Sequence, residues 1–192
     1  MRRLWYYYLY LLIVWGSFRY FVRLPDVIEE LWFKPLIWLV PLFWWGLSLS
    51  TKLVMFGKDL FRSVVWGVFV GALYFGLIRR FNFNGEIGNL DMMGVALATA
   101  VTEELTFSGF VAGYLEKIQK GKWINFLIVG LMVAVIRLPI LLFVYGLGLV
   151  DLVGVIFFAG ASGIINAWIR IRTGNVTGSI LARLGMNLAV LG

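Results

Sequence analysis

Seven apolar stretches fill most of this chain, and they limit its possible folds more than any other feature of the sequence. They cover residues 4–22, 35–50, 63–80, 92–115, 123–145, 150–170 and 174–192. A hydrocarbon core about 30 Å thick is crossed by roughly 20 helical residues, so most of these stretches are long enough to span a bilayer. Backbone groups in lipid must find hydrogen bonds within their own segment, which makes each span a helix. The pattern predicts an all-α, polytopic transmembrane helix bundle of about seven spans, in one membrane-embedded domain over residues 1–192.

Composition supports a membrane protein and excludes several other classes. The chain is 61% hydrophobic and only 14% charged, whereas a soluble domain has about a quarter of its residues charged. Its net charge of +7 then indicates contact with membrane lipid rather than with nucleic acid, because no polar domain remains to hold a duplex. The sequence has no Cys and no His, so we expect no disulfide, metal or other cofactor. Small residues, as at 159–163, predict close helix contacts.

The basic residues between the stretches predict how the chain is oriented. If the spans alternate, one side carries ten basic residues and the other side carries five. Because basic residues collect in cytoplasmic loops, this bias favours the plasma (cytoplasmic) membrane, with the N-terminus cytoplasmic and the C-terminus outside. No small-residue cleavage site follows the first stretch, so we expect a span there and not a removed signal peptide. We expect residues 79–91 to form an external loop. The ten basic residues of the predicted cytoplasmic side are Arg2, Arg3, Lys52, Lys58, Arg62, Lys117, Lys120, Lys122, Arg170 and Arg172. The five of the opposite side are Arg19, Arg23, Lys34, Arg79 and Arg80.

Four charges fall near the middle of predicted spans, where lipid would surround them on a lone helix. They are Glu103 and Glu104 in the fourth span, Arg137 in the fifth and Arg183 in the seventh. Each would cost about 2.5–3.5 kcal/mol at the centre of an isolated helix. An Arg guanidinium can hold a carboxylate through two hydrogen bonds, so we expect the four groups to pair inside the bundle.

Three polar residues and one proline accompany these charges. Ser108 lies four residues after Glu104, and Asn187 four after Arg183, so each pair shares a helix face. Asn166, midway along the sixth span, is either part of the same cluster or a separate hydrogen bond between helices. Pro139 is expected to weaken the fifth helix and to widen a cavity there. A neutral set of two Glu and two Arg is compatible with a functional site, which mid-membrane charges favour, and also with a purely structural helix contact.

Three segments that hold these residues resemble the motifs of the CPBP family, which comprises CAAX proteases and bacteriocin-processing (Abi) enzymes. Residues 103–109, EELTFSG, look like the first motif, Glu-Glu-x-x-x-Arg followed by Gly. Residues 133–139, VAVIRLP, are similar to the second, Phe-x-x-x-His before Pro. Residues 172–187, RTGNVTGSILARLGMN, are similar to the third, His-x-x-x-Asn, with its approach sequence. The resemblance covers residues 90–192 as the motif-bearing core, whereas residues 1–85 form generic spans.

The departures from the family pattern fall where chemistry would occur. Arg137 and Arg183 stand at the two motif His positions, and Ser108 stands at the motif Arg position. The resemblance implies an intramembrane endopeptidase, a hydrolase in which one Glu activates a water and His and Asn assist. Glu103, Glu104 and Asn187 are the residues that would remain for catalysis. Arg has no lone pair for a metal and holds a carboxylate away from water, so we expect peptidase activity to be lost.

The sequence therefore predicts a degenerate family member, a pseudoenzyme that binds another membrane protein or a membrane-inserted peptide without cutting it. Two alternatives remain open. One is an active glutamate-type endopeptidase that uses Glu103 or Glu104, with an Arg as oxyanion stabiliser. The other is a small carrier or channel, since mid-membrane charges are also typical of those proteins.

Overall fold

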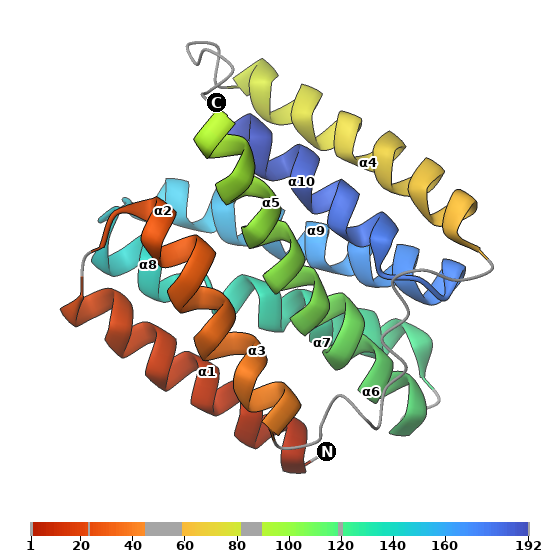
Figure 1. The fold of residues 1–192 in the computed structure, drawn as a ribbon, viewed down its shortest axis with the longest axis horizontal. Helices are drawn as coiled ribbons and strands as arrows, with labels where there is room; N and C mark the ends of the chain where they lie inside the picture. The colour runs from red at the N-terminus through yellow and green to blue at the C-terminus, as the bar shows by residue number, and fades with distance from the viewer. Residues whose placement is uncertain (1, 23, 45–58, 82–89, 119–120, 192) are drawn as a thin grey trace.

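The chain folds into a bundle of helices that cross one another at moderate angles (Figure 1). The structure is a computed structural model that describes residues 2–22, 24–44, 59–81, 90–118 and 121–191. Within these ranges every regular element is a helix, as predicted. The elements are α1 (Arg2–Phe21), α2 (Asp26–Ile28), η1 (Glu29–Phe33), α3 (Lys34–Trp44), α4 (Leu60–Phe81), α5 (Leu90–Glu104), η3 (Leu105–Val111), α6 (Ala112–Ile118), α7 (Lys122–Val135), α8 (Leu138–Phe143), α9 (Leu149–Thr173) and α10 (Thr177–Leu191).

Several of these elements join into longer helices that correspond to the predicted spans. The π-helical segments η1 and η3 continue their neighbours, so that α2–η1–α3 forms one helix and α5–η3–α6 forms another. Four helices in the described ranges are long and apolar enough to cross a membrane by length and composition. They are Leu60–Arg80, Met92–Ile118, Trp123–Phe143 and Leu149–Thr173. The chain is a multi-pass membrane protein with an all-α fold.

The helix of the second predicted span begins earlier than the sequence predicted. Its helix runs from Asp26 to Trp44 in the described part of the chain, whereas the apolar stretch suggested 35–50. The early boundary was missed because Glu29, Glu30 and Lys34 resemble loop charges, although they are helical and largely buried. Residues 45–50 of this span and residues 82–89 of the predicted external loop lie outside the described residues.

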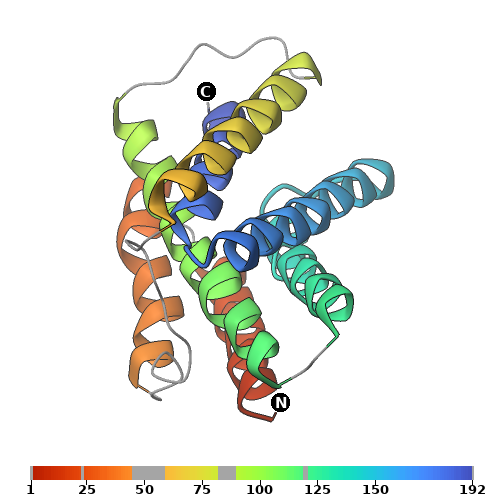
Figure 2. The same cartoon turned by 90° about the vertical axis from the view of Figure 1, so that its right-hand side faces the viewer.

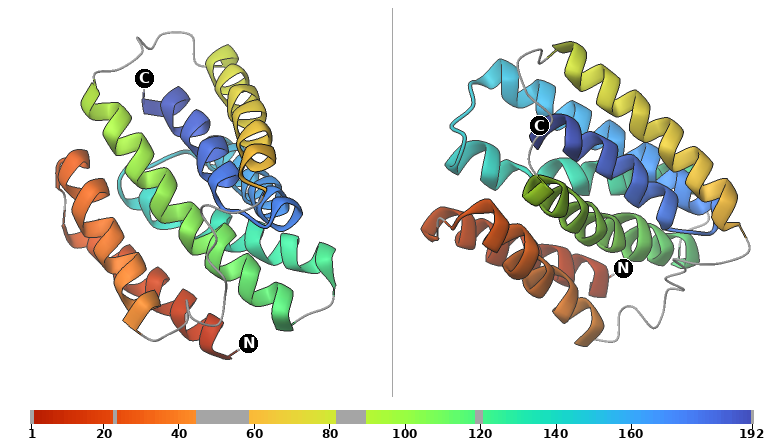
Figure 3. Two further views of the ribbon diagram at one scale, coloured as in Figure 1. Left: turned by 45° about the vertical axis from the view of Figure 1, so that its right-hand side comes forward. Right: turned by 45° about the horizontal axis from the view of Figure 1, so that its top comes forward.

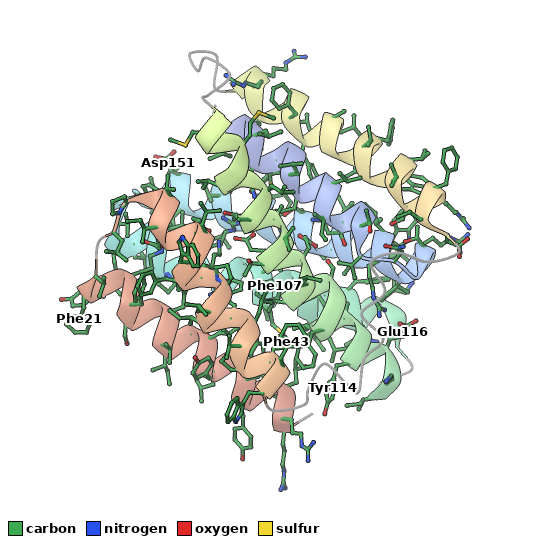
Figure 4. The ribbon with its side chains drawn as sticks, viewed as in Figure 1. Phe21, Phe43, Phe107, Tyr114, Glu116 and Asp151 are labelled. Carbon is green, nitrogen blue, oxygen red and sulfur yellow. The ribbon has the colours of Figure 1, made fainter. Side chains whose placement is uncertain are left out.

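Successive long helices run in opposite directions, which gives the bundle two distinct ends (Figures 1 and 3). At one end, called the basic end because Arg3, Arg62 and Arg172 lie there, α1, α4, α7 and α10 begin, and α3, α6 and α9 finish. At the far end, α1, α4, α8 and α10 finish, and α2, α5 and α9 begin. Figure 4 marks the basic end by Tyr114 and Glu116 and the far end by Asp151, with Phe107 between them. The start of α1 and the end of α10 lie at opposite ends of the bundle (Figure 2).

Glycine residues allow the closest helix contacts. A Cβ atom on Gly67 of α4 would meet the carbonyl oxygen of Gly178 on α10, and one on Gly185 would meet that of Gly71. Between α7 and α9, a Cβ on Gly130 would lie 2.7 Å from the carbonyl oxygen of Gly160. Larger residues at these points would force the helices apart, which confirms the predicted role of small residues in helix packing.

Aromatic side chains hold the N-terminal hairpin of α1 and α3 against the rest of the bundle. The Trp15 and Trp38 rings meet edge to face with their centroids 5.9 Å apart. The Tyr7 hydroxyl donates to the carbonyl of Trp38 at 2.6 Å, and the Tyr8 hydroxyl donates to that of Met132 on α7 at 2.7 Å. In Figure 3 the hairpin lies beside α5 along much of its length. The hairpin is thereby fixed close to the helix that carries Glu103.

Candidate functional site

Glu103 and Glu104 lie at the end of α5, where the helix widens into the π-helical segment η3. Consecutive residues of an α-helix point about 100° apart, so neighbouring carboxylates meet different helices. A π-helical turn inside an α-helix changes this register and is frequent at functional sites. The two carboxylates therefore have separate partners, which are described in turn.

Glu104 is sealed inside the bundle. Its Oε1 accepts hydrogen bonds from Arg183 Nε at 2.8 Å and from Asn166 Nδ2 at 2.7 Å. Its Oε2 accepts a short hydrogen bond from the hydroxyl of Ser108. The side chains of Glu104 and Arg183 are 1% and 0% exposed. The predicted Arg–Glu pairing is confirmed here, and Ser108 and Asn166 both belong to the cluster.

Three cations contact Glu103, whereas the sequence predicted only two in the cluster, Arg137 and Arg183. Arg137 Nη2 lies 2.6 Å from Oε2, and Lys34 Nζ lies 2.9 Å from Oε1. Arg183 Nε is 3.5 Å from Oε2 and so joins the two carboxylates. Arg137 reaches this point because α7 ends at Val135 and α8 begins at Leu138, leaving Arg137 on a turn. The interruption beside Pro139 agrees with the predicted weakening of this helix.

Lys34 extends the cluster into the N-terminal hairpin. Its Nζ also donates to Glu30 Oε2 at 2.7 Å, and Thr99 donates to the same oxygen at 2.8 Å. Arg19 Nη2 donates to Glu30 Oε1 at 2.9 Å and contacts Glu29 as well. The described network thus pairs four cations with four carboxylates. They are Arg19, Lys34, Arg137 and Arg183, with Glu29, Glu30, Glu103 and Glu104.

This extension corrects two sequence predictions. Arg19 and Lys34 were assigned to loop ends, and only Glu103 and Glu104 were expected among the internal acids. The side chains of Arg19 and Lys34 are in fact 6% and 5% exposed. The one available signal was the Glu30–Lys34 spacing, since residues four apart pair on one face of a helix.

Asn187 lies beside the site, but no hydrogen bond described in the structure joins it to Glu103 or Glu104. Its Nδ2 donates to the carbonyl of Ala96 on α5 at 3.1 Å. This bond ties α10 to α5 one turn beyond Arg183. Arg183 and Asn187 both form hydrogen bonds with residues of α5, as their predicted shared face requires, and Asn187 belongs to the lining of the cavity described next.

A cavity of about 630 Å³ lies between the network and the far end of the bundle. Glu103, Arg137 and Asn187 belong to its lining, whereas Glu104 and Arg183 do not. Most of the remaining wall is apolar, including Ile140, Phe158 and Met186. Of the two motif carboxylates, only Glu103 can meet a bound molecule in this cavity.

The residues present do not suit a catalytic metal. Zinc sites use His, Cys or carboxylate ligands, and Arg offers no lone pair. Neither His nor Cys occurs in the sequence, and the described part of the chain contains no cluster of three acidic residues able to hold an ion. The oxygens of Glu103 and Glu104 are already engaged by cationic, amide or hydroxyl donors.

Comparison with known protein families identifies the family of this chain. The family model described as Type II CAAX prenyl endopeptidase Rce1-like matches residues 85–189. The chain belongs to this Rce1-like family. The resemblance drawn from the three motifs is confirmed at the level of the family. No curated protein matches the chain, and no solved structure matches it.

The matched region includes both motif carboxylates and both pairing arginines, but it excludes the N-terminal hairpin. Lys34, which binds Glu103, lies outside the match to the Rce1-like family. The site therefore combines residues of the family region with one cation supplied by the preceding helices.

Proposed function

We propose that this protein is a non-hydrolysing member of the Rce1-like family that binds a membrane-inserted peptide or another membrane protein. The observation that carries the proposal is the state of Glu103, the one motif carboxylate in the cavity wall. Lys34 engages one of its oxygens and Arg137 engages the other. A general base must instead accept a hydrogen bond from the water that it activates.

Glu104 is still less suited to act on a peptide bond. It is 1% exposed, and its oxygens accept from Arg183, Asn166 and Ser108. Water would have to displace one of these donors and enter a part of the bundle away from the cavity. These contacts support a structural role for Glu104.

The dimensions of the cavity restrict the part of a partner that can enter it. The cavity measures about 630 Å³, which lies in the size range of small-molecule sites. A chain end or a long apolar group of the partner therefore enters, while the rest of the partner remains among lipids.

One observation favours a second candidate, an active glutamate-type endopeptidase. Glu103 does line a cavity, and Arg137 beside it is able to stabilise an oxyanion. This candidate requires Glu103 to leave Lys34 or Arg137 when substrate binds. The experiment must therefore separate cleavage from binding.

A prenylated, internally quenched peptide carrying a photocrosslinker tests both candidates with the full chain in phosphatidylcholine vesicles. We expect crosslinking but no cleavage that depends on Glu103, so the wild type and Glu103→Gln should release equal fluorescence. Glu116→Gln is the matched control, because Glu116 is an acid on the same long helix, 48% exposed and paired with Arg170. Cleavage that disappears only in Glu103→Gln would establish the protease. The absence of both cleavage and crosslinking would refute the binding role.

We also propose that the basic end lies in the cytoplasm and that the cavity lies toward the outer side of the plasma membrane. Because Arg19 and Lys34 belong to the buried network, the predicted imbalance of ten basic residues against five becomes ten against three. An introduced Cys would be the only one, since the natural sequence has none. We expect a membrane-impermeant maleimide to label Asp151→Cys in intact cells, and to label Arg3→Cys only after lysis. The opposite pattern would reverse the orientation.

A further inference from the structure

Arg137 differs from the other three cations of the network in how much of its hydrogen-bonding capacity is used. Its side chain is 25% exposed, whereas those of Arg19, Lys34 and Arg183 are 6%, 5% and 0% exposed. A guanidinium has five N–H donors. Among the described residues, Arg137 donates only to Glu103, through Nη2. Arg137 lines the cavity, and no described hydrogen bond uses its Nε or Nη1.

Glu103 does not need all of the charge of Arg137. Lys34 and Arg183 lie within 3.5 Å of its carboxylate as well. A second acceptor on Arg137 would therefore not leave Glu103 without a cation. This surplus distinguishes Arg137 from Arg183, whose Nε is the close ion-pair partner of the buried Glu104.

The charge of the wall also favours an anion. Three cations line the cavity, namely Arg19, Lys34 and Arg137, against two carboxylates, Glu30 and Glu103. The lining carries a net charge of +1 at neutral pH, although the whole network is balanced. A ligand with a single negative charge complements this wall.

The rest of the lining selects the body of the ligand. Beyond the charged floor the wall is formed largely by aliphatic and aromatic side chains such as Leu77, Ile140 and Phe158. A bare hydrocarbon chain loses no hydrogen bonds when it enters the cavity, whereas each amide that finds no partner there costs free energy. The volume of about 630 Å³ lies in the range of small-molecule sites.

We infer that the cavity binds a long-chain fatty acid from the membrane, with Arg137 as the residue that recognises its carboxylate. The inference goes beyond the proposed function, because it assigns a lipid ligand to the cavity whether or not a partner also enters it. The C-terminal end of an extended apolar peptide carries the same carboxylate, but its amides would lack partners along the apolar wall, so it is the competing outcome of the test. Arg137 then acts as a specificity determinant and has no part in hydrolysis.

Matched ligand pairs test the inference on the purified full chain in a non-ionic detergent. The first pair is palmitic acid and its methyl ester, and the second is an apolar pentapeptide as the free acid and as the C-terminal amide. Each competes with a fluorescent fatty acid. A charge-assisted hydrogen bond is worth a tenfold or larger difference in affinity, so we expect palmitic acid to bind at least tenfold tighter than its methyl ester. Discrimination in the peptide pair alone would overturn the fatty acid as the ligand.

Arg137→Lys is the matching variant, because it keeps the cation for Glu103 and removes the planar fork. We expect it to reduce the acid preference, with a thermal melt near that of the wild type. Arg170→Lys is the control, since Arg170 pairs with Glu116 at the basic end. Equal binding of palmitic acid and its methyl ester overturns the inference, as does an identical preference in the two variants. Palmitic acid has no peptide bond, so this result is independent of the cleavage test of the proposed function.

Discussion

Glu103 and Glu104 are adjacent in the sequence, but they occupy opposite kinds of environment. Glu104 is enclosed by η3, α9 and α10, all of them inside the region that matches the Rce1-like family. Glu103 faces a cavity and takes one of its cations from Lys34, outside that region. The comparison teaches that the neighbouring helices, and not the Glu-Glu motif itself, decide what each carboxylate can do.

The two environments also differ in how they respond to the loss of a partner. A buried carboxylate whose cation is removed has no compensation from water, which is costly. Glu104 has one close cation, Arg183, whereas Glu103 has three within 3.5 Å and borders the cavity. Stability should therefore depend most on Arg183, less on Lys34 and least on Arg137.

The largest effect is expected from Arg183→Leu. It leaves Glu104 buried without a cation, so the free energy of unfolding should fall by about 3–5 kcal/mol. Unfolding in mixed detergent micelles measures this loss. Adding Glu104→Gln should recover most of it, because the neutral amide no longer needs a counter-ion. A double variant no more stable than the single one would contradict the pairing.

A smaller effect is expected from Lys34→Met, which keeps the length of the side chain without its charge. Its two hydrogen bonds to carboxylates disappear, but Glu30 keeps Arg19 and Glu103 keeps Arg137. We expect a loss of about 2 kcal/mol. Hydrogen exchange should show weaker protection of residues 26–44, while α9 and α10 remain protected. Equal loosening of all helices would argue against a separate role for the hairpin.

The smallest effect is expected from Arg137→Leu. The side chain is 25% exposed, and Glu103 retains Lys34 and Arg183, so the free energy of unfolding should fall by about 1 kcal/mol. The same unfolding assay as for Arg183→Leu allows a direct comparison. If the two variants lose equal stability, the distinction between a sealed carboxylate and a cavity carboxylate fails.

Much of this arrangement was predictable from local sequence. Apolar stretches about as long as a bilayer is thick predicted the helices, because lipid allows few other structures. Mid-span placement predicted that Arg137 and Arg183 pair with the two Glu residues, since a lone charge in lipid is costly. The four-residue spacing predicted that Ser108 would reach Glu104, and Pro139 predicted the break after α7.

Only the tertiary structure decided which carboxylate faces the cavity and which other charges join the network. Arg19 and Lys34 lie near the ends of apolar stretches, where a basic residue usually extends to the membrane surface. Sequence position does not reveal whether such a side chain turns inward instead. The contact between Lys34 and Glu103 joins residues 69 positions apart. It exists because the aromatic packing of α1 and α3 brings that hairpin against α5, and such packing depends on the whole bundle rather than on any local pattern.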